Sequence, residues 1–199
     1  MASNKSSTLK TGDLVQVTIE KVAHGGHFIA RHDGAVIFVR HAIPGENCTI
    51  QITSTGSSFN RADVVSVEAP SEFRVEAPCS FANRNGCGGC DFQHISVEHQ
   101  RTLKSDVIAE QFSRIAKIEM RVEVEEVGES THWRTRAIAT TDRNGKLGFY
   151  KSRSHSIAPV TDCIICVEGM DFSEIASRDL KGDVRVEISA SNTGERSIA

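Results

Sequence analysis

The chain has 199 residues, enough for one large or two small domains. Hydrophobic residues make up 39% and charged residues 25%, an ordinary globular balance, and the net charge of −3 excludes a global positive field. Any nucleic-acid surface must therefore be local. The N-terminus lacks the apolar core of a signal peptide, and no apolar run reaches the ~20 residues of a transmembrane helix. We expect a cytoplasmic protein with no membrane partner.

Short strand patterns separated by turn signals dominate the first third of the chain. Residues 1–9 are polar and are expected to be a disordered tail. Apolar and polar residues alternate from Val15 to Ile19, and Asp33-Gly34 is a hairpin signal. About five short strands in so few residues predict a small closed barrel of the OB type at 10–68, with a sandwich as the alternative.

The barrel region also contains four histidines and a cysteine, which are side chains that could bind a metal. Four histidines lie within eighteen positions, but they fall around turns and lack acidic or cysteine partners. We expect solvated loop residues at His24, His27, His32 and His41. Cys48 stands alone and is expected to be a buried structural cysteine.

The remainder, 69–199, is predicted to be a small α+β domain, so the fold class is mainly β with α+β. Ala69-Pro70 and Ala77-Pro78 indicate an extended linker, because proline disfavours helix in the residue before it. A helix is predicted from Ser96 to about Ile118, with one apolar face. Strands are predicted at 122–127, 135–141, 147–150 and 184–188, and a polar run after them is expected to turn.

Five of the six cysteines are clustered in the second domain: Cys79, Cys87, Cys90, Cys163 and Cys166. In a reducing compartment such clusters indicate metal binding rather than disulfides. The glycines between Cys87 and Cys90 free the backbone to aim both thiolates at one centre. Three close cysteines and a distant fourth suit a [4Fe–4S] cluster, whereas two CxxC pairs suit structural zinc. The spacing alone does not decide between an iron–sulfur cluster and structural zinc.

A basic stretch runs from Thr131 to His155. It contains six cationic residues against one acidic residue, a local charge of +5, with aromatic residues interleaved. Arginine and lysine can bind phosphates and aromatic faces can stack on unpaired bases, although a solvated hairpin would show the same composition.

The motif Cys79-x7-Cys87-Gly-Gly-Cys90-Asp-Phe-Gln-His94 resembles that of the RNA uracil-C5 methyltransferases, which modify rRNA or tRNA with S-adenosylmethionine. Further segments follow in that family's order, across roughly 8–170: Trp133-Arg134-Thr-Arg136, Gly148-Phe149-Tyr150 and Ser154-His155-Ser-Ile157. The resemblance implies that the barrel at 10–68 is a TRAM domain that binds RNA, and it implies a [4Fe–4S] cluster on Cys79, Cys87, Cys90 and Cys163. It also favours RNA binding at Trp133, Arg134, Arg136, Lys151, Arg153 and His155.

Two departures from the family limit this reading. Ile164 stands where the family often has proline, and Cys166 competes with Cys163 as fourth ligand. No glycine-rich turn for S-adenosylmethionine and no catalytic cysteine motif is found. We therefore expect the RNA-recognition and cluster-binding half of a methyltransferase, inactive alone, with a separate catalytic domain or chain as partner. The alternatives are a stand-alone, non-enzymatic RNA-binding module and a zinc-stabilised structural or interaction protein.

Overall fold

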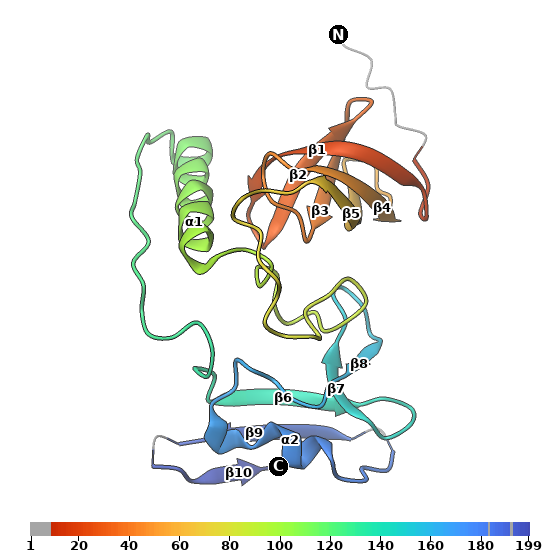
Figure 1. The fold of residues 1–199 in the computed structure, drawn as a ribbon, viewed down its shortest axis with the longest axis vertical. Coiled ribbons are helices and arrows are strands. Elements are labelled where there is room, and N and C mark those ends of the chain that lie inside the picture. Colours follow the sequence, from red (N-terminus) through yellow and green to blue (C-terminus); the bar gives the residue numbers. More distant parts are fainter. Residues whose placement is uncertain (1–8, 183, 192) are drawn as a thin grey trace. The chain divides into compact units, whose positions relative to one another are not determined.

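The computed structural model describes residues 9–182, 184–191 and 193–199, so the predicted tail lies outside the described residues except for its last position. The chain forms two compact units that alternate along the sequence (Figure 1). The first comprises residues up to Glu76 together with Asp91–Glu125, and the second comprises Ala77–Cys90 with Glu126–Ala199. The sequence-based division at 68/69 was contiguous, whereas the chain passes from one unit to the other three times.

The first unit contains a closed barrel, which confirms the predicted OB-type architecture. Its strands are β1 (Leu14–Ala23), β2 (His27–His32), β3 (Ala35–Arg40), β4 (Asn47–Ser54) and β5 (Asn60–Ala69). They are ordered β1-β2-β3-β5-β4, and β4 pairs with β1 to close the ring. All pairings are antiparallel except β3 with β5, which is the Greek-key crossover of an OB fold.

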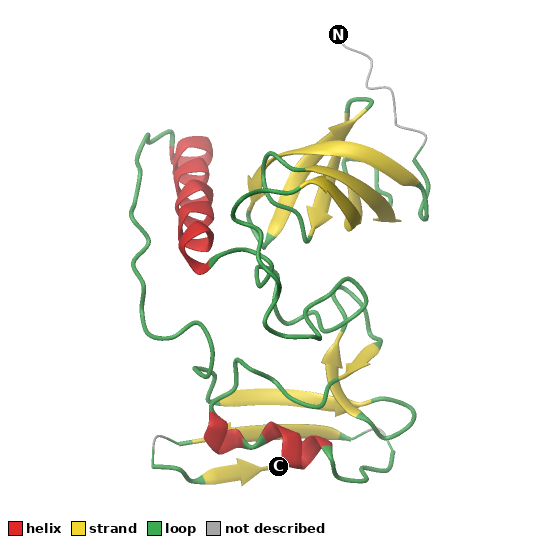
Figure 2. Cartoon of the chain, viewed as in Figure 1, coloured by secondary structure: helices red, strands yellow, loops and turns green. Residues whose placement is uncertain are grey.

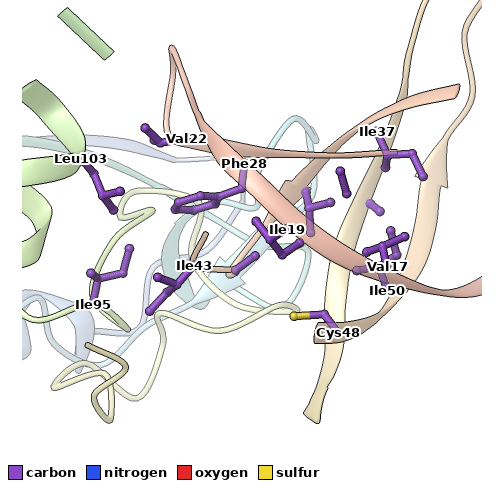
Figure 3. Close-up of a cluster of buried hydrophobic side chains, with 14 of the residues drawn as sticks. Val17, Ile19, Val22, Phe28, Ile37, Ile43, Cys48, Ile50, Ile95 and Leu103 are labelled. Atoms are coloured by element: carbon purple, nitrogen blue, oxygen red, sulfur yellow. The ribbon is translucent and has the colours of Figure 1, made fainter. Parts of the chain in front are cut away.

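Alternating apolar residues from the barrel strands form the core of this unit (Figure 3). Val17 and Ile19 of β1, Phe28 of β2 and Ile37 of β3 point inward, as the period of two in a strand requires. Cys48 of β4 lies among them with 1% of its surface exposed. Burial, reinforced by the nearby Glu46 carboxylate, raises the pKa of Cys48 to about 12. The prediction that Cys48 is buried is confirmed.

A buried ion pair ties the linker after β5 to the barrel. The Glu46 carboxylate is fully buried and accepts hydrogen bonds from the Arg74 guanidinium at 2.6 Å. It also accepts the backbone N–H groups of Ile43 at 2.8 Å and Ser71 at 3.1 Å. A buried carboxylate needs this full set of hydrogen-bond donors, because an unpaired charge there would destabilise the fold by roughly 3–5 kcal/mol.

The expectation of solvated histidines is wrong for two of the four. His24 is exposed, but His27 is buried and its Nδ1 lies 2.7 Å from the Gly25 carbonyl oxygen. His41 takes a left-handed φ of 63° and its ring lies 5.8 Å from that of His94. Burial, together with the charge of Arg40, lowers the pKa of His41 to about 4. Sequence position near a turn did not reveal that His27 packs edge-on against Phe38 or that His94, from beyond the barrel, packs against His41.

Helix α1 (Val97–Gln111) and a π-helical turn at Phe112–Ala116 complete the first unit and confirm the predicted helix. Leu103 of α1 and Ile95 before it pack into the barrel's core cluster (Figure 3). Ser96 stands at the N-cap, but its side chain makes no capping hydrogen bond. The predicted strand at 122–127 is wrong: the segment pairs with no strand among the described residues, and Val127 is 89% exposed.

The described residues of the second unit form a five-stranded antiparallel sheet with short helices packed on it (Figure 2). Its order is β10-β9-β6-β7-β8, with β6 (Arg136–Thr141), β7 (Leu147–Tyr150), β8 (Ile157–Pro159), β9 (Arg185–Ala190) and β10 (Arg196–Ile198). The 3-10 turn Glu168–Met170 and α2 (Phe172–Ala176) place Met170, Phe172 and Ile175 in its core.

This sheet confirms the three other strands predicted after the helix and adds elements that were missed. The Asn144-Gly145 turn joins β6 to β7 as expected, with Gly145 at a φ of 75°. Strands β8 and β10 have only three residues each and α2 only five, too short for periodicity to show. Among the described residues no helix has the length and apolar character needed to cross a bilayer.

Candidate metal centre and nucleic-acid interface

The cysteine loop, residues 79–90, is built from consecutive tight turns in the second unit. The Ala82 N–H donates to the Cys79 carbonyl at 3.0 Å, and the Cys87 N–H donates to the Phe81 carbonyl at 2.8 Å. A Cβ on Gly86 would lie 2.1 Å from the Phe81 carbonyl oxygen, so no larger residue fits there. These turns fold the chain back on itself between Cys79 and Cys87.

The two glycines between Cys87 and Cys90 have separate roles. The Gly89 N–H donates to the Cys87 sulfur at 3.3 Å, the kind of bond that stabilises a thiolate. The Gly88 N–H donates to the Tyr150 carbonyl at 3.0 Å. A Cβ on Gly88 would lie 2.5 Å from the Ser152 backbone nitrogen. Gly88 is therefore required for close approach to the β7–β8 turn, a reason that the sequence did not reveal.

The four predicted ligands share one neighbourhood. Burial raises the pKa of Cys87, the Gly89 N–H opposes that rise, and the charges of Cys90, Cys163 and Cys79 add to it. Cys163 thus lies near the loop although it is 73 positions beyond Cys90. Over residues 9–182, 184–191 and 193–199, no three Cys, His, Asp or Glu side chains are placed so that they could hold one metal ion. Four neighbouring thiols are nevertheless the soft donor set that an iron–sulfur cluster or zinc takes.

Cys163 and Cys166 differ sharply in their surroundings. The Cys166 N–H donates to the Cys163 carbonyl at 2.9 Å, which closes a turn between them. The Cys166 thiol donates to the Cys163 sulfur, which lowers the pKa of Cys163 to about 6 and raises that of Cys166. Cys166 is 4% exposed and belongs to the core of the unit. Cys163 is the member of the pair whose charge acts on Cys87.

Two of the predicted RNA-binding residues lie beside this second cysteine pair. The Arg134 N–H donates to the Ile165 carbonyl at 2.7 Å, and the Val167 N–H donates to the Arg134 carbonyl at 2.9 Å. Trp133 is 54% exposed, and the Arg134 guanidinium lies 5.3 Å from its ring centroid. The segment therefore presents a partly exposed indole ring with a guanidinium over it.

Three more of the predicted residues lie in the β7–β8 turn. The Lys151 N–H donates to the Ser156 carbonyl at 2.9 Å, and Arg153 takes a left-handed φ of 50°. Arg153 and His155 are exposed, and the His155 ring meets Tyr150 edge-on at 6.4 Å. Tyr150 is exposed and was missing from the predicted set. Its place at the end of a predicted strand, directly before Lys151, was the available signal.

The other cations of the basic stretch lie in β6 and in the β6–β7 turn. Arg136 forms an ion pair with Glu187 at 2.6 Å, so part of its charge is already neutralised. Arg143 and Lys146 flank the β6–β7 turn, at the opposite end of β7 from Lys151. A run that is continuous in sequence is therefore distributed over the segment before β6, β6 itself and two turns.

Comparison with known proteins gives these features a context. Residues 9–65 match the TRAM domain family. The chain is 40% identical over 203 residues to an uncharacterized RNA methyltransferase of Streptomyces coelicolor, covering 94% of this chain and 44% of that protein. It is 33% identical over 199 residues to an uncharacterized RNA methyltransferase of Listeria innocua, covering 98% and 43%.

A solved structure shares the fold. The crystal structure of Pyrococcus abyssi tRNA (uracil-54, C5)-methyltransferase in complex with S-adenosyl-L-homocysteine matches with a TM-score of 0.56 at 16% identity. The match covers 92% of this chain and 44% of that one. The chain thus spans less than half the length of these three proteins. The part of the inferred resemblance that concerns RNA methyltransferases with a TRAM domain is confirmed.

Proposed function

Because the chain is homologous to the RNA methyltransferases, we propose that it is the RNA-recognition and [4Fe–4S]-binding portion of an enzyme that forms 5-methyluridine in rRNA or tRNA. One observation carries the proposal. The cysteine loop is hydrogen-bonded through Gly88 to Tyr150, and the turn between Cys163 and Cys166 is hydrogen-bonded through Ile165 to Arg134. Each of these two partner segments presents cations and an exposed aromatic ring. A metal centre that holds the cysteine loop and Cys163 together would therefore also hold both aromatic segments in place.

Cys79, Cys87, Cys90 and Cys163 would hold the cluster, and its contribution when bound would be a covalent cross-link between distant parts of the chain. Two observations support this assignment: the four thiols lie near one another, and the Gly89 N–H donates to the Cys87 sulfur. Cys166 is assigned to the core, where its thiol donates to Cys163. Zinc on the two CxxC pairs is the competing assignment.

The protein's own groups would then hold the RNA. Trp133 and Tyr150 offer exposed ring faces for unpaired bases, and Arg134, Lys151 and Arg153 offer charges for phosphates. Arg136 and His155 complete the predicted set, although the ion pair with Glu187 weakens the case for Arg136.

Methyl transfer belongs to the whole enzyme in this proposal. S-adenosylmethionine, the nucleophilic cysteine and the base would come from a catalytic domain or chain outside the described residues. We expect the 199-residue chain alone to incorporate no methyl group into RNA from labelled cofactor. Incorporation by the purified chain would contradict this part of the proposal.

Metal analysis after anaerobic purification tests the cluster. We expect a brown protein with about four iron and four sulfide per chain. Cys79→Ser should lose the iron, because it removes a ligand, whereas Cys166→Ser should keep it. A colourless protein with one zinc that survives Cys79→Ser but not Cys166→Ser would establish the zinc assignment instead.

RNA binding is tested in parallel, since a stand-alone RNA-binding module is the other candidate. Both candidates predict binding by the chain, and they differ in whether an added catalytic domain restores methylation. Absence of any RNA affinity in the metal-loaded chain would contradict both.

A further inference from the structure

Cys163 and Cys166 are the two ends of one tight turn in the second unit. The Cys166 N–H donates to the Cys163 carbonyl at 2.9 Å, which closes a four-residue turn. The end residues of such a turn have Cα atoms within about 7 Å of each other, and a disulfide spans Cα atoms up to about 7 Å apart. The Cys166 thiol also donates to the Cys163 sulfur, so the two side chains point toward each other.

The segment before β6 holds this turn in place through backbone hydrogen bonds. The His132 N–H donates to the Ile164 carbonyl at 2.9 Å. The N–H groups of Trp133 and Arg134 both donate to the Ile165 carbonyl, at 3.0 and 2.7 Å. Both residues between the two cysteines are therefore fixed through their carbonyl groups, and the fold itself keeps the two sulfurs close.

The two thiols differ in their access to solvent. Cys163 is partly exposed, whereas Cys166 belongs to the core of the unit. An oxidant from solvent therefore meets Cys163 first and finds Cys166 directly behind it. An accessible cysteine next to a second thiol is typical of reversible redox sites, because the second thiol reacts before oxidation becomes irreversible.

The proposed cluster does not account for Cys166. It uses Cys163 as a ligand and leaves Cys166 in the core, although the thiol of Cys166 is hydrogen-bonded to that ligand. A small apolar side chain would fill the same place in the core without the reactivity of a thiol. The pairing of the two sulfurs is therefore a feature that metal binding by Cys163 alone leaves unexplained.

We propose that Cys163 and Cys166 form a redox pair: when Cys163 holds no metal, a hydroperoxide joins them in a reversible disulfide that keeps metal from binding. A metal ligand must be a thiolate, and a disulfide sulfur is not one. The proposal rests on the proposed function only in taking Cys163 as a metal ligand. All the residues concerned belong to the second unit.

The oxidation proceeds in two balanced steps. The Cys163 sulfur attacks one oxygen of the hydroperoxide, the O–O bond breaks, and water or an alcohol leaves with the Cys163 proton, so that Cys163 becomes a sulfenic acid. The Cys166 sulfur then attacks the Cys163 sulfur. The S–S bond forms, the S–O bond breaks, and water leaves with the Cys166 proton. The two thiols lose two electrons to the peroxide, and a dithiol returns them by thiol–disulfide exchange.

Peptide mapping of the full chain tests the redox pair. Metal-loaded and chelator-treated samples are exposed to hydrogen peroxide, denatured, alkylated with N-ethylmaleimide and digested with trypsin. Cleavage after arginine separates most of the cysteines into distinct peptides: Cys48 in 41–61, Cys87 with Cys90 in 85–101, and Cys163 with Cys166 in 154–178.

We expect an internal disulfide in peptide 154–178 of the chelator-treated chain, and its loss when dithiothreitol precedes alkylation. The same peptide from the metal-loaded chain should carry two alkylated cysteines, as should 85–101 in both samples at limiting peroxide. The inference is overturned if 154–178 stays fully alkylated in the chelator-treated chain, or if 85–101 is oxidised before it.

Cys166→Ala is the matched variant, because it removes the second thiol and keeps the proposed ligand. It should load the same amount of metal as the wild type. After peroxide treatment and dithiothreitol, the wild type should load metal again, whereas the variant should not, because its Cys163 goes on to the irreversible sulfinic acid. Cys48→Ala removes the other buried cysteine and should recover as the wild type does. Equal recovery of Cys166→Ala and wild type would contradict the proposal.

The identity of the metal separates this inference from the proposed function. Uptake of zinc in place of iron would remove the cluster from the proposed function, and a disulfide in 154–178 would still establish the redox pair. Iron uptake by a chain that never forms this disulfide would leave the proposed function intact and refute the redox pair alone.

Discussion

At the scale of single residues, the same side chain behaves differently according to what surrounds it. Cys48 is enclosed by apolar strands beside a carboxylate, which raises its pKa to about 12 and leaves an inert thiol. Cys163 accepts a hydrogen bond from the Cys166 thiol, which lowers its pKa to about 6 and favours the thiolate that binds metals. Sequence spacing separated Cys48 from the others but could not rank Cys163 against Cys166.

His41 makes the barrel sensitive to acid. Its folded pKa of about 4 lies below the unfolded value of 6.5, so the unfolded state takes up the proton first as pH falls. Stability is therefore complete above pH 6.5 and is lost progressively down to pH 4. Between pH 7 and pH 5 we expect the barrel to lose about 1–2 kcal/mol of unfolding free energy.

His41→Asn is the matched variant for that measurement. Asparagine tolerates the left-handed φ of 63° at this position, and the His41 Nε2 has no hydrogen-bond partner among the described residues. Hydrogen exchange of amides in β2 and β3, corrected for intrinsic rates, reports the barrel's stability. The variant should show a smaller loss between pH 7 and pH 5; an equal loss would assign the acid sensitivity to His94 or to carboxylates instead.

At the scale of elements, the cysteine loop and the β7–β8 turn are coupled through Gly88. Gly88→Ala places a Cβ 2.5 Å from the Ser152 nitrogen and 2.8 Å from the Lys151 carbonyl carbon, and both are backbone atoms that cannot swing aside. We expect a loss of about 1–3 kcal/mol in the thermal unfolding of the second unit, and weaker RNA binding.

Gly89→Ala provides the control, because the nearest atom to its Cβ would be the Cys87 sulfur at 3.3 Å. We expect Gly89→Ala to reduce the stability of the second unit and its RNA affinity less than Gly88→Ala does. If Gly88→Ala leaves both stability and RNA affinity at wild-type values, the coupling between loop and turn is wrong.

Local pattern was enough to predict long elements whose partners lie near in sequence. The barrel strands, α1 and the β6–β7 hairpin were all readable from alternation, helical periodicity and Asn144-Gly145. The segment 122–127 alternates equally well, yet it is no strand, because alternation describes one face and does not supply a neighbour for the backbone. Likewise the basic stretch was visible as a run of cations, but its distribution over the segment before β6, β6 and two turns was not.

At the scale of the whole molecule, the two units should respond separately to metal removal. All four candidate ligands belong to the second unit. A cross-link between the cysteine loop and Cys163 closes a long loop, which by comparison with disulfides is worth about 3–5 kcal/mol. Chelation should therefore lower the stability of the second unit by that amount and leave the barrel unchanged.

The chain offers a convenient reporter for this experiment. Trp133, its one tryptophan, lies in the second unit, while amide exchange in β1–β5 follows the first. We expect the fluorescence midpoint to fall on chelation while barrel exchange stays constant. Equal loss in both units would show that the centre supports the molecule as a whole.

The distance along the chain between the cysteine loop and Cys163 also sets an order in time. During synthesis the barrel strands and the first three thiols leave the ribosome well before Cys163, which follows Cys90 by 73 positions. At ~5–20 residues per second, that interval is roughly 4–15 s. Under the proposed function, a nascent chain would expose an incomplete ligand set during that interval, and cluster delivery would have to wait until translation had passed the fourth cysteine.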